Sequence, residues 1–220
     1  MKKVIIFGPG ILGQVVHFYL TKDSDFEVVA FTANQDFIKE KSLFDLPIIP
    51  FEKIEMEYPP EKFSMFIAIP YTKMNKNRSQ IYYEAKEKGY ELISYINSKA
   101  TIWGDTEIGD NCLILENNVI QPFVRIGNNV IIWSGNHIGH HSTIEDHNFI
   151  SSHVVISGNV KIKEHCFLGV NSTIRDGITI SSECLIGAGS VILHNTLEKQ
   201  VYTVNSTKLL DLTSDKLSHL

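Results

Sequence analysis

The chain has 220 residues, of which 43% are hydrophobic and 20% charged, and its 25 acidic against 20 basic side chains give a net charge of −5. This composition is typical of a globular protein and excludes disordered, collagen-like and coiled-coil chains. The acidic balance and the lack of a dense basic stretch disfavour nucleic acid as a partner. The first apolar run is broken at Gly8-Pro9-Gly10 with no cleavage site after it, and no segment is long enough to span a membrane. The three cysteines form no CxxC pair, so we expect a cytoplasmic protein with reduced thiols.

Residues 1–96 predict a small α/β domain with a Rossmann-like sheet. Apolar runs bounded by polar or glycine residues indicate strands, and apolar residues at helical spacing indicate helices. In chain order the expected elements are a strand at 4–7, a helix at 11–20, strands at 27–31 and 65–69, a helix at 75–89 and a closing strand at 91–95.

A glycine-rich turn, Gly8-Pro9-Gly10-Ile11-Leu12-Gly13, lies between the first strand and the first helix. Such a turn lets a phosphate approach backbone amides at a helix N-terminus, although the glycines can also serve only close helix packing. A dinucleotide site needs an acidic residue after the second strand, where this chain has Thr32-Ala33-Asn34, so NAD is disfavoured. A single nucleotide needs less. Polar residues suitably placed for it after the strands are Thr32, Asn34, Tyr71, Thr72 and Lys73.

The second half of the chain has a six-residue repeat. From Ile96 to Ile192 every sixth residue is Ile or Leu, and a small residue usually stands two positions earlier. A period of six fits neither a helix nor a long alternating strand, but it fits a triangular coil in which each face uses one hexapeptide. We therefore predict a left-handed parallel β-helix over residues 97–197, with eighteen residues in each coil. Residues 198–220 lose the repeat and form a tail with a last strand at 201–204.

The three cysteines, Cys112, Cys166 and Cys184, all fall on the small-residue position, so we expect them to be buried and structural. Histidines are concentrated in one stretch: His137, His140, His141, His147 and His153. Their spacing disfavours a metal site. The histidine ligands of β-helix carbonic anhydrases include a pair five residues apart, and no two histidines of this chain have that separation. General-base catalysis needs only one histidine.

His140 and His141 are expected at a corner of the coil, and Gly158 lies eighteen residues after His140. The Gly158 amide can then stabilise an oxyanion beside the histidine. Glu145 and Asp146 are candidates to orient the imidazole. We expect His147 in a surface turn, whereas His137 and His153 serve either ligand contact or polar packing.

Several motifs resemble a known family. The glycine-rich α/β domain precedes a coil with the segments Gly139-His140-His141-Ser142, Ser157-Gly158-Asn159-Val160-Lys161-Ile162 and Cys166-Phe167-Leu168-Gly169-Val170-Asn171. This arrangement resembles the hexapeptide-repeat sugar acyltransferases. Within them it is most similar to the nucleotide-linked amino-sugar N-acetyltransferases of the bacillosamine and perosamine type, and to sialic acid O-acetyltransferase-like proteins.

The resemblance implies a homotrimer without metal, with acetyl-CoA lying along the coil and three active sites between adjacent coils. It implies that His140 is the catalytic histidine and that Gly158 donates to the oxyanion. Contacts to acetyl-CoA fall on Gly158, Gly169, Val170, Gly187 and Ala188. Nucleotide contacts fall on Gly8, Gly10, Ile11 and the segment Tyr71, Thr72 and Lys73.

Three departures from the family pattern stand out. His141 replaces the glutamate that often follows the catalytic histidine, so the two histidines can exchange roles. Acidic residues are missing around 32–34, which leaves the nucleotide base open. The usual closing Gly-x-Pro-Ala-Lys is replaced by Val204-Asn205-Ser206-Thr207-Lys208, so contacts to the adenine end of CoA are not carried over.

We therefore expect an acetyl-CoA-dependent N-acetyltransferase of a nucleotide-linked amino-deoxy sugar, in surface glycan biosynthesis, with histidine as the general base. O-acetylation of a sugar hydroxyl, as in sialic acid, is the main alternative. A scaffold that binds nucleotide sugar without catalysis and a metal-dependent hydratase are the alternatives from other classes.

Overall fold

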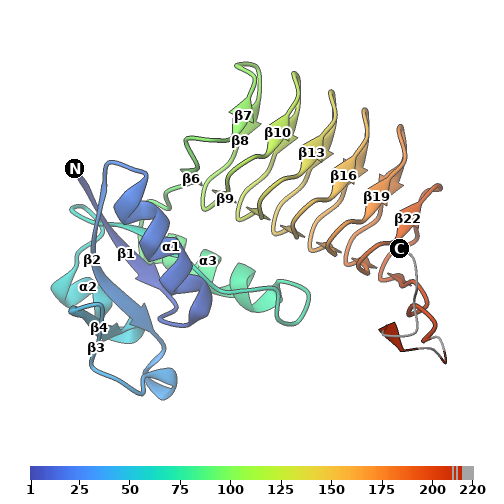
Figure 1. Ribbon diagram of the computed structural model, residues 1–220. Helices are drawn as coiled ribbons and strands as arrows, with labels where there is room; N and C mark the ends of the chain where they lie inside the picture. The colour runs from blue at the N-terminus through green and yellow to red at the C-terminus, as the bar shows by residue number, and fades with distance from the viewer. Residues whose placement is uncertain (210, 212, 215–220) are drawn as a thin grey trace.

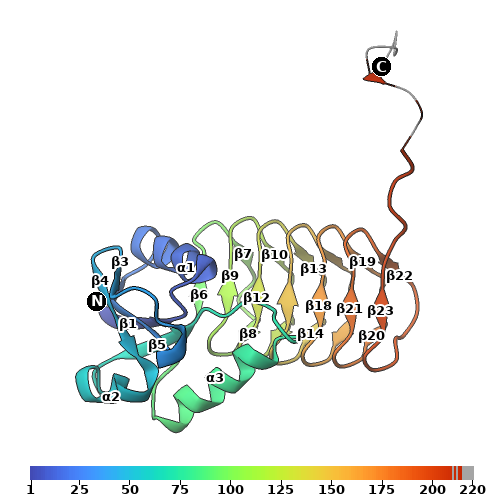
Figure 2. The same ribbon diagram turned by 90° about the horizontal axis from the view of Figure 1, so that it is seen from below.

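The structure is a computed structural model that describes residues 1–209, 211, 213 and 214. A small α/β domain lies beside one end of a long regular coil (Figure 1). After the last coil strand the chain leaves the coil and extends away from it (Figure 2).

The N-terminal domain is a five-stranded sheet in the order β3-β4-β2-β1-β5, parallel except for β3. Its strands are β1 (Lys2–Phe7), β2 (Phe26–Ala33), β3 (Ser42–Leu43), β4 (Leu46–Pro50) and β5 (Ser64–Ile67). Its helices are α1 (Ile11–Lys22), α2 (Ile54–Glu57) and α3 (Lys76–Glu87), with short 3-10 turns at Gln35–Phe37 and Phe51–Lys53. The predicted strands and helices up to residue 89 are confirmed, with small shifts at their ends.

The structure of this domain contains one hairpin that the sequence did not predict, and it lacks one strand that the sequence did predict. The hairpin of β3 and β4 was not predicted, because its tight turn is made by Phe44 and Asp45, both with positive φ, rather than by a glycine. The closing strand expected at 91–95 is wrong. Leu92 makes only an isolated bridge to Met65, and the next strand, β6 (Tyr95–Ile96), already pairs with the coil.

The coil has three parallel sheets that form the faces of a triangular prism. Sheet I contains β6 (Tyr95–Ile96), β9 (Leu113–Ile114), β12 (Ile131–Ile132), β15 (Phe149–Ile150), β18 (Phe167–Leu168), β21 (Leu185–Ile186) and β23 (Val201–Tyr202). Sheet II contains β7 (Thr101–Ile102), β10 (Val119–Ile120), β13 (His137–Ile138), β16 (Val155–Ile156), β19 (Thr173–Ile174) and β22 (Val191–Ile192). Sheet III contains β8 (Glu107–Ile108), β11 (Arg125–Ile126), β14 (Thr143–Ile144), β17 (Lys161–Ile162) and β20 (Thr179–Ile180).

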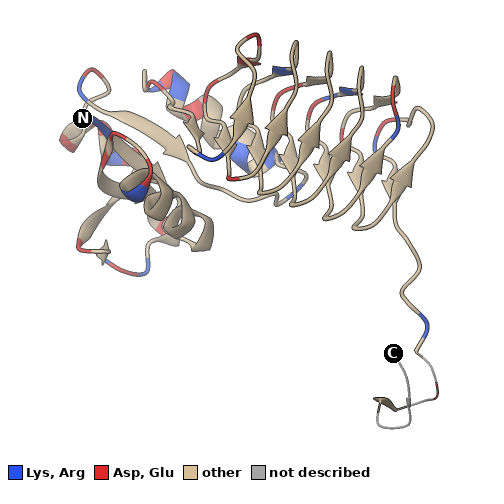
Figure 3. Cartoon of the chain, turned by 45° about the horizontal axis from the view of Figure 1, so that its top comes forward, with Lys and Arg blue, Asp and Glu red and all other residues tan. Residues whose placement is uncertain are grey.

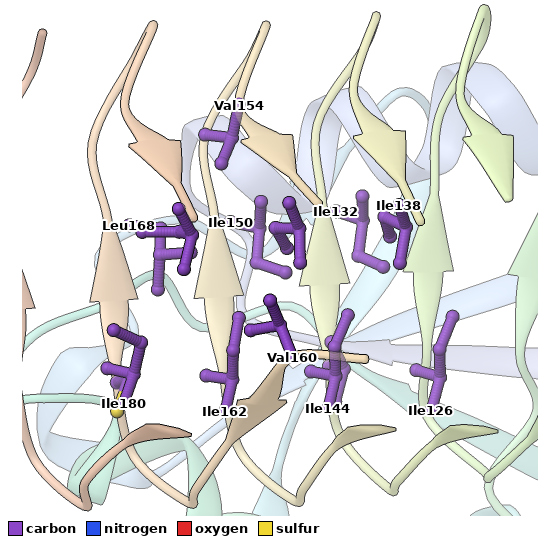
Figure 4. Packing of buried hydrophobic residues seen from close by; sticks show 14 of the residues in the cluster. Ile126, Ile132, Ile138, Ile144, Ile150, Val154, Val160, Ile162, Leu168 and Ile180 are labelled. Carbon is purple, nitrogen blue, oxygen red and sulfur yellow. The ribbon is translucent and has the colours of Figure 1, made fainter. Parts of the chain in front are cut away.

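The predicted six-residue period is the packing period of the prism. Paired strands are offset by eighteen residues, so Ile126, Ile144, Ile162 and Ile180 stack in one interior row (Figure 4). The repeat aliphatics are buried except at the N-terminal end, where Ile96 stays 42% exposed because no coil lies beneath it. The three cysteines are free and buried in this core, as expected, and burial raises the pKa of the Cys112 thiol to about 12.

The corners of the prism explain the histidine-rich stretch. At every sixth position from residue 111 to 189 the backbone has positive φ, a conformation that favours glycine and, among other residues, asparagine and histidine. His141, His147 and His153 all occupy such positions, so their density reflects corner geometry. His140 and His137 do not, and another reason is needed for them.

The N-terminal domain covers sheet I and the corner between sheets III and I. Apolar residues of β1 and α1 share one core with Leu113, Ile131 and Phe149 of sheet I. Helix α3 runs alongside the coil (Figure 2) and inserts Arg78, which is fully buried. The guanidinium of Arg78 donates to Asn75 Oδ1, Asn129 Oδ1 and the carbonyls of Asn129, His147 and Asn148. Burial lowers the pKa of Arg78 to about 9, so it remains a cation at neutral pH.

His147 lies in this interface and is 1% exposed, so the expectation of a surface turn is wrong about its surroundings. Its ring contacts Asn129 Nδ2 through Nδ1 and the Tyr83 hydroxyl through Nε2, each at 2.9 Å. Burial, together with the neighbouring His165, lowers the pKa of His147 to about 4. The side chain is therefore neutral at physiological pH and holds α3 against the coil.

Candidate functional site

The corner between sheets II and III carries the predicted catalytic pair. His140 follows β13, and Gly158 occupies the same position one coil further on. A Cβ built on Gly158 would lie 2.7 Å from His140 Cε1 and 2.8 Å from Nε2, so the imidazole lies over the glycine Cα. In the described part of the chain the Gly158 N–H has no hydrogen-bond acceptor. The structure thus brings together an exposed imidazole and a free backbone donor.

His141 is the partner of the His140 ring. The two Nδ1 atoms are 3.1 Å apart, and the His140 backbone N–H donates to Gln121 Oε1 at 2.9 Å. His141 packs on the ring of Phe123, with centroids 4.7 Å apart, which fixes its own orientation. His141 therefore holds a ring nitrogen within hydrogen-bonding distance of the His140 ring.

The structure does not bring Glu145 to His140. Glu145 lies at the next corner, between sheets III and I, and its carboxylate pairs with Lys161 at 2.8 Å. Asp146 accepts a hydrogen bond from the Asn128 N–H at 2.7 Å at that same corner. The expectation that these carboxylates orient the histidine is therefore wrong. The chain turns to another face of the prism with each hexad, so residues of the next hexad lie at a different corner.

A separate cavity of about 730 Å³ opens in the N-terminal domain at the carboxyl ends of β1 and β2. Gly8, Gly10, Asn34 and Lys73, four of the residues that we expect to contact the nucleotide, line it. Gly10 immediately precedes α1, no side chain caps this helix, and a Cβ on Gly10 would meet nothing within 4 Å. Free amides at a helix N-terminus, with Lys73 nearby, suit a phosphate group. Gly8 has φ of +103° and Gly13 packs against the Gly8 carbonyl, so other glycines of the turn serve close packing.

Four other predicted nucleotide contacts lie outside this cavity. Thr32 is fully buried and its hydroxyl donates to the Ile49 carbonyl at 2.8 Å, a structural role that overturns its assignment as a substrate contact. Ile11 is exposed but does not line the cavity. Tyr71 packs on two phenylalanine rings of sheet I, and the Thr72 hydroxyl accepts from Asn77 Nδ2. A position after a strand end does not by itself show that a side chain faces the ligand.

The predicted acetyl-CoA contacts apart from Gly158 lie at a third location. Gly169, Val170, Gly187 and Ala188 follow β18 and β21, at the corner between sheets I and II. His140 lies at the corner between sheets II and III, so sheet II separates the two groups within one chain. Residues missed by sequence reasoning include Gln121, Phe123 and Phe37; the last lines the cavity and is 75% exposed.

Among the described residues, no group of three or more histidine, cysteine, aspartate or glutamate side chains is arranged to hold a metal ion. None of the helices in the described chain is long and apolar enough to cross a bilayer.

Comparisons with known proteins agree with this architecture. The family profile described as the GMPPB C-terminal domain matches residues 92–191. A histidine-to-asparagine variant of perosamine N-acetyltransferase from Caulobacter crescentus, in complex with CoA and GDP-perosamine, is similar in structure, with a TM-score of 0.80 and 21% identity over 91% of this chain and 93% of that one. No match is found among curated protein sequences.

Two further solved structures are similar over nearly the whole chain. The acetyltransferase domain of PglB from Neisseria gonorrhoeae FA1090, in complex with acetyl coenzyme A, has a TM-score of 0.78 and 25% identity over 91% of this chain and 95% of that one. WeeI from Acinetobacter baumannii AYE has a TM-score of 0.79 and 17% identity over 96% of this chain and 100% of that one. The predicted fold, a small α/β domain followed by a left-handed parallel β-helix, is confirmed, and it is shared with a perosamine N-acetyltransferase and an acetyltransferase domain.

Proposed function

We propose that the protein transfers an acetyl group from acetyl-CoA to the amino group of a nucleotide-linked amino-deoxy sugar, in the cytoplasm, for surface glycan biosynthesis. One observation carries the proposal: the His140 imidazole lies over Gly158, whose N–H is free. A general base beside an unused backbone donor is the arrangement that acyl transfer requires. The similar Caulobacter and Neisseria proteins, solved with CoA or acetyl-CoA, support the choice of acyl donor.

In this mechanism His140 removes a proton from the acceptor nitrogen as it attacks the thioester carbon. The Gly158 N–H stabilises the oxyanion, and the CoA sulfur leaves and is protonated. For His140 Nε2 to accept a proton, its Nδ1 must carry the hydrogen and donate to His141 Nδ1. His141 then carries its own hydrogen on Nε2 and acts as a positioning residue.

The cavity in the N-terminal domain is the proposed site for the nucleotide. Its apolar floor includes Phe7 and Ile48, while Gly10 and Lys73 offer the amides and the positive charge that a diphosphate needs. Asn34 supplies a polar edge for the base or ribose, and Phe37 offers an exposed ring at the cavity. GDP-perosamine in the Caulobacter complexes is a ligand of the corresponding class.

The proposed active site combines parts of two chains in a homotrimer. The cavity belongs to the domain that covers sheet I, whereas His140 lies at the opposite corner of the prism. Sheet II separates His140 from the proposed acetyl-CoA contacts other than Gly158, and its strands contain no Lys, Arg, Asp or Glu (Figure 3). Its outward Val119, Val155 and Val191 are 39%, 40% and 61% exposed. A second copy packed on this uncharged face would bring the corner that carries His140 in one chain and the corner that carries the other acetyl-CoA contacts in its partner into one cleft.

The test measures thiol release from acetyl-CoA with UDP-, dTDP- and GDP-linked 3-amino and 4-amino sugars and with free sialic acid. Activity on an amino sugar is expected, and His140→Ala should lower the rate by about 10² to 10⁴ without dissociating the oligomer. Activity on sialic acid alone would move the assignment to O-acetylation. Turnover of no acceptor would leave nucleotide-sugar binding without catalysis as the better account.

A complementation experiment tests the shared site. At acceptor concentrations well below KM, His140→Ala chains should be nearly inactive because they lack the base, and Lys73→Ala chains should keep only about a tenth of the parent rate because nucleotide binding is weaker. Coexpressed at equal levels, they should recover about a quarter of the parent activity, the share of sites that combine two intact halves. Recovery of none would place both halves in one chain.

A further inference from the structure

Gly158 has a carboxylate on the side opposite His140. Asp176 occupies the same corner position one coil beyond Gly158, after β19. A Cβ built on Gly158 would lie 2.8 Å from His140 Nε2 and 3.0 Å from Asp176 Oδ1. Each of these polar atoms lies within about 3 Å of that point, so the two are less than about 6 Å apart across the space that the missing side chain of Gly158 leaves open. One nitrogen atom seated farther out from the Gly158 Cα than a Cβ can therefore hydrogen-bond to both.

Asp176 has no evident structural role. Its carboxylate is exposed and forms no hydrogen bond or ion pair within the described residues. At the corner between sheets III and I, Asp146 has the same register and does have a role, since its Oδ1 accepts from the Asn128 N–H at 2.7 Å. Asp176 makes no such bond to the Gly158 N–H, so both groups remain available to a ligand.

We propose that Asp176 and His140 form the subsite for the acceptor's amino group, bound as an ammonium ion. This inference rests on the proposed acetyl transfer and assigns its acceptor class. Amino groups are largely protonated near neutral pH, and an ammonium donates charge-assisted hydrogen bonds to a carboxylate. A sugar hydroxyl is neutral and gains much less from Asp176. The pair thus favours amine over hydroxyl acceptors.

The proton balance of the step follows from this arrangement. Asp176 accepts one hydrogen bond from the ammonium while His140 Nε2 takes one of its protons, which frees the nitrogen lone pair. The nitrogen forms a bond to the thioester carbon, the carbon–sulfur bond breaks, and the thiolate takes the proton held by His140. The extra proton left on the amide nitrogen is released to solvent. The products are the acetamido sugar, CoA with a free thiol and one proton.

The experiment compares Asp176→Asn with Asp105→Asn, an exposed aspartate at the same corner of the coil. Asp176→Asn should raise KM for the amino sugar about 10- to 100-fold, the loss of one hydrogen bond to a charged group, with a much smaller change in kcat. KM for acetyl-CoA and the thermal midpoint should stay unchanged. Asp176→Glu should restore part of the affinity, and Asp105→Asn should behave as the parent.

Calorimetric titration gives a readout that does not need turnover. The ligands are the same nucleotide sugars in pairs that carry an amino or a hydroxyl group at one carbon. The parent should bind the amino member more tightly, and Asp176→Asn should abolish that preference. Equal affinity for both members, an unchanged KM in Asp176→Asn, or an equal loss in Asp105→Asn would overturn the subsite. A parent that binds and turns over none of these sugars would instead refute the proposed function.

Discussion

Replacement of Gly158 by alanine tests the contact between the glycine and the base. The added Cβ would lie 2.7 Å from His140 Cε1 and 2.8 Å from Nε2, whereas ordinary carbon contacts are about 3.5 Å or longer. The obstructing atoms belong to the exposed end of a flexible side chain, so the imidazole can rotate away. Gly158 does not have a positive φ, and alanine is therefore compatible with its backbone.

The expected cost is catalytic and not structural. The His140 ring must move by about 1 Å to relieve the contact, and a misplacement of that size lowers a rate by about 100-fold. Gly158 is buried, but the added Cβ meets only the ends of the exposed side chains of His140 and Asp176 and introduces no backbone strain, so the free energy of unfolding should change by less than about 1 kcal/mol. Gly158→Ala should therefore reduce kcat strongly while the thermal midpoint stays near that of the parent.

The assay is steady-state thiol release from acetyl-CoA at saturating acceptor. Gly104→Ala is the matched control, because Gly104 occupies the same corner row three coils earlier and a Cβ there meets nothing within 4 Å. The control should keep the parent rate. Full activity in Gly158→Ala would show that the approach of His140 to this glycine is not needed for the reaction.

Arg78→Met should lower the free energy of unfolding by about 3 kcal/mol or more in urea denaturation, because buried carbonyl groups lose their hydrogen-bond donor. The control Arg125→Met, at an exposed arginine, should have little effect. Stability should fall as the pH drops from about 6.5 towards 4, by at most about 3 kcal/mol, because the unfolded chain takes up a proton that buried His147 resists. His147→Asn should flatten this pH profile and His153→Asn, at an exposed corner of the same backbone conformation, should not. Lys73→Ala should weaken nucleotide-sugar binding in calorimetry about tenfold and leave KM for acetyl-CoA unchanged.

The candidate catalytic pair was predictable because the coil converts spacing into position. Eighteen residues separate His140 from Gly158, and one coil contains eighteen residues, so the sequence alone places one above the other. Asp176 follows Gly158 by another eighteen residues, so the sequence also places Asp176 above Gly158. Glu145 was misplaced because six residues move the chain to the next face of the prism.

The N-terminal domain was less predictable in detail. The glycine turn and the strand order explain why Gly10, Asn34 and Lys73 meet at one cavity. Nothing in the local pattern distinguishes them from Thr32, whose hydroxyl is used by a neighbouring strand. Side chains at strand ends are sorted into ligand contacts and structural ones by their tertiary neighbours.

The sequence by itself determined the coil, the burial of its repeat aliphatics and cysteines, and the register of its corners, because a strictly periodic chain repeats one local solution. Only the tertiary structure decided how the two units dock. Arg78 and His147 give no local sign that they are buried, since their partners lie on distant segments brought together by α3. It also decided that the cavity of the N-terminal domain and His140 lie on opposite sides of the prism, because that separation depends on which face the N-terminal domain covers.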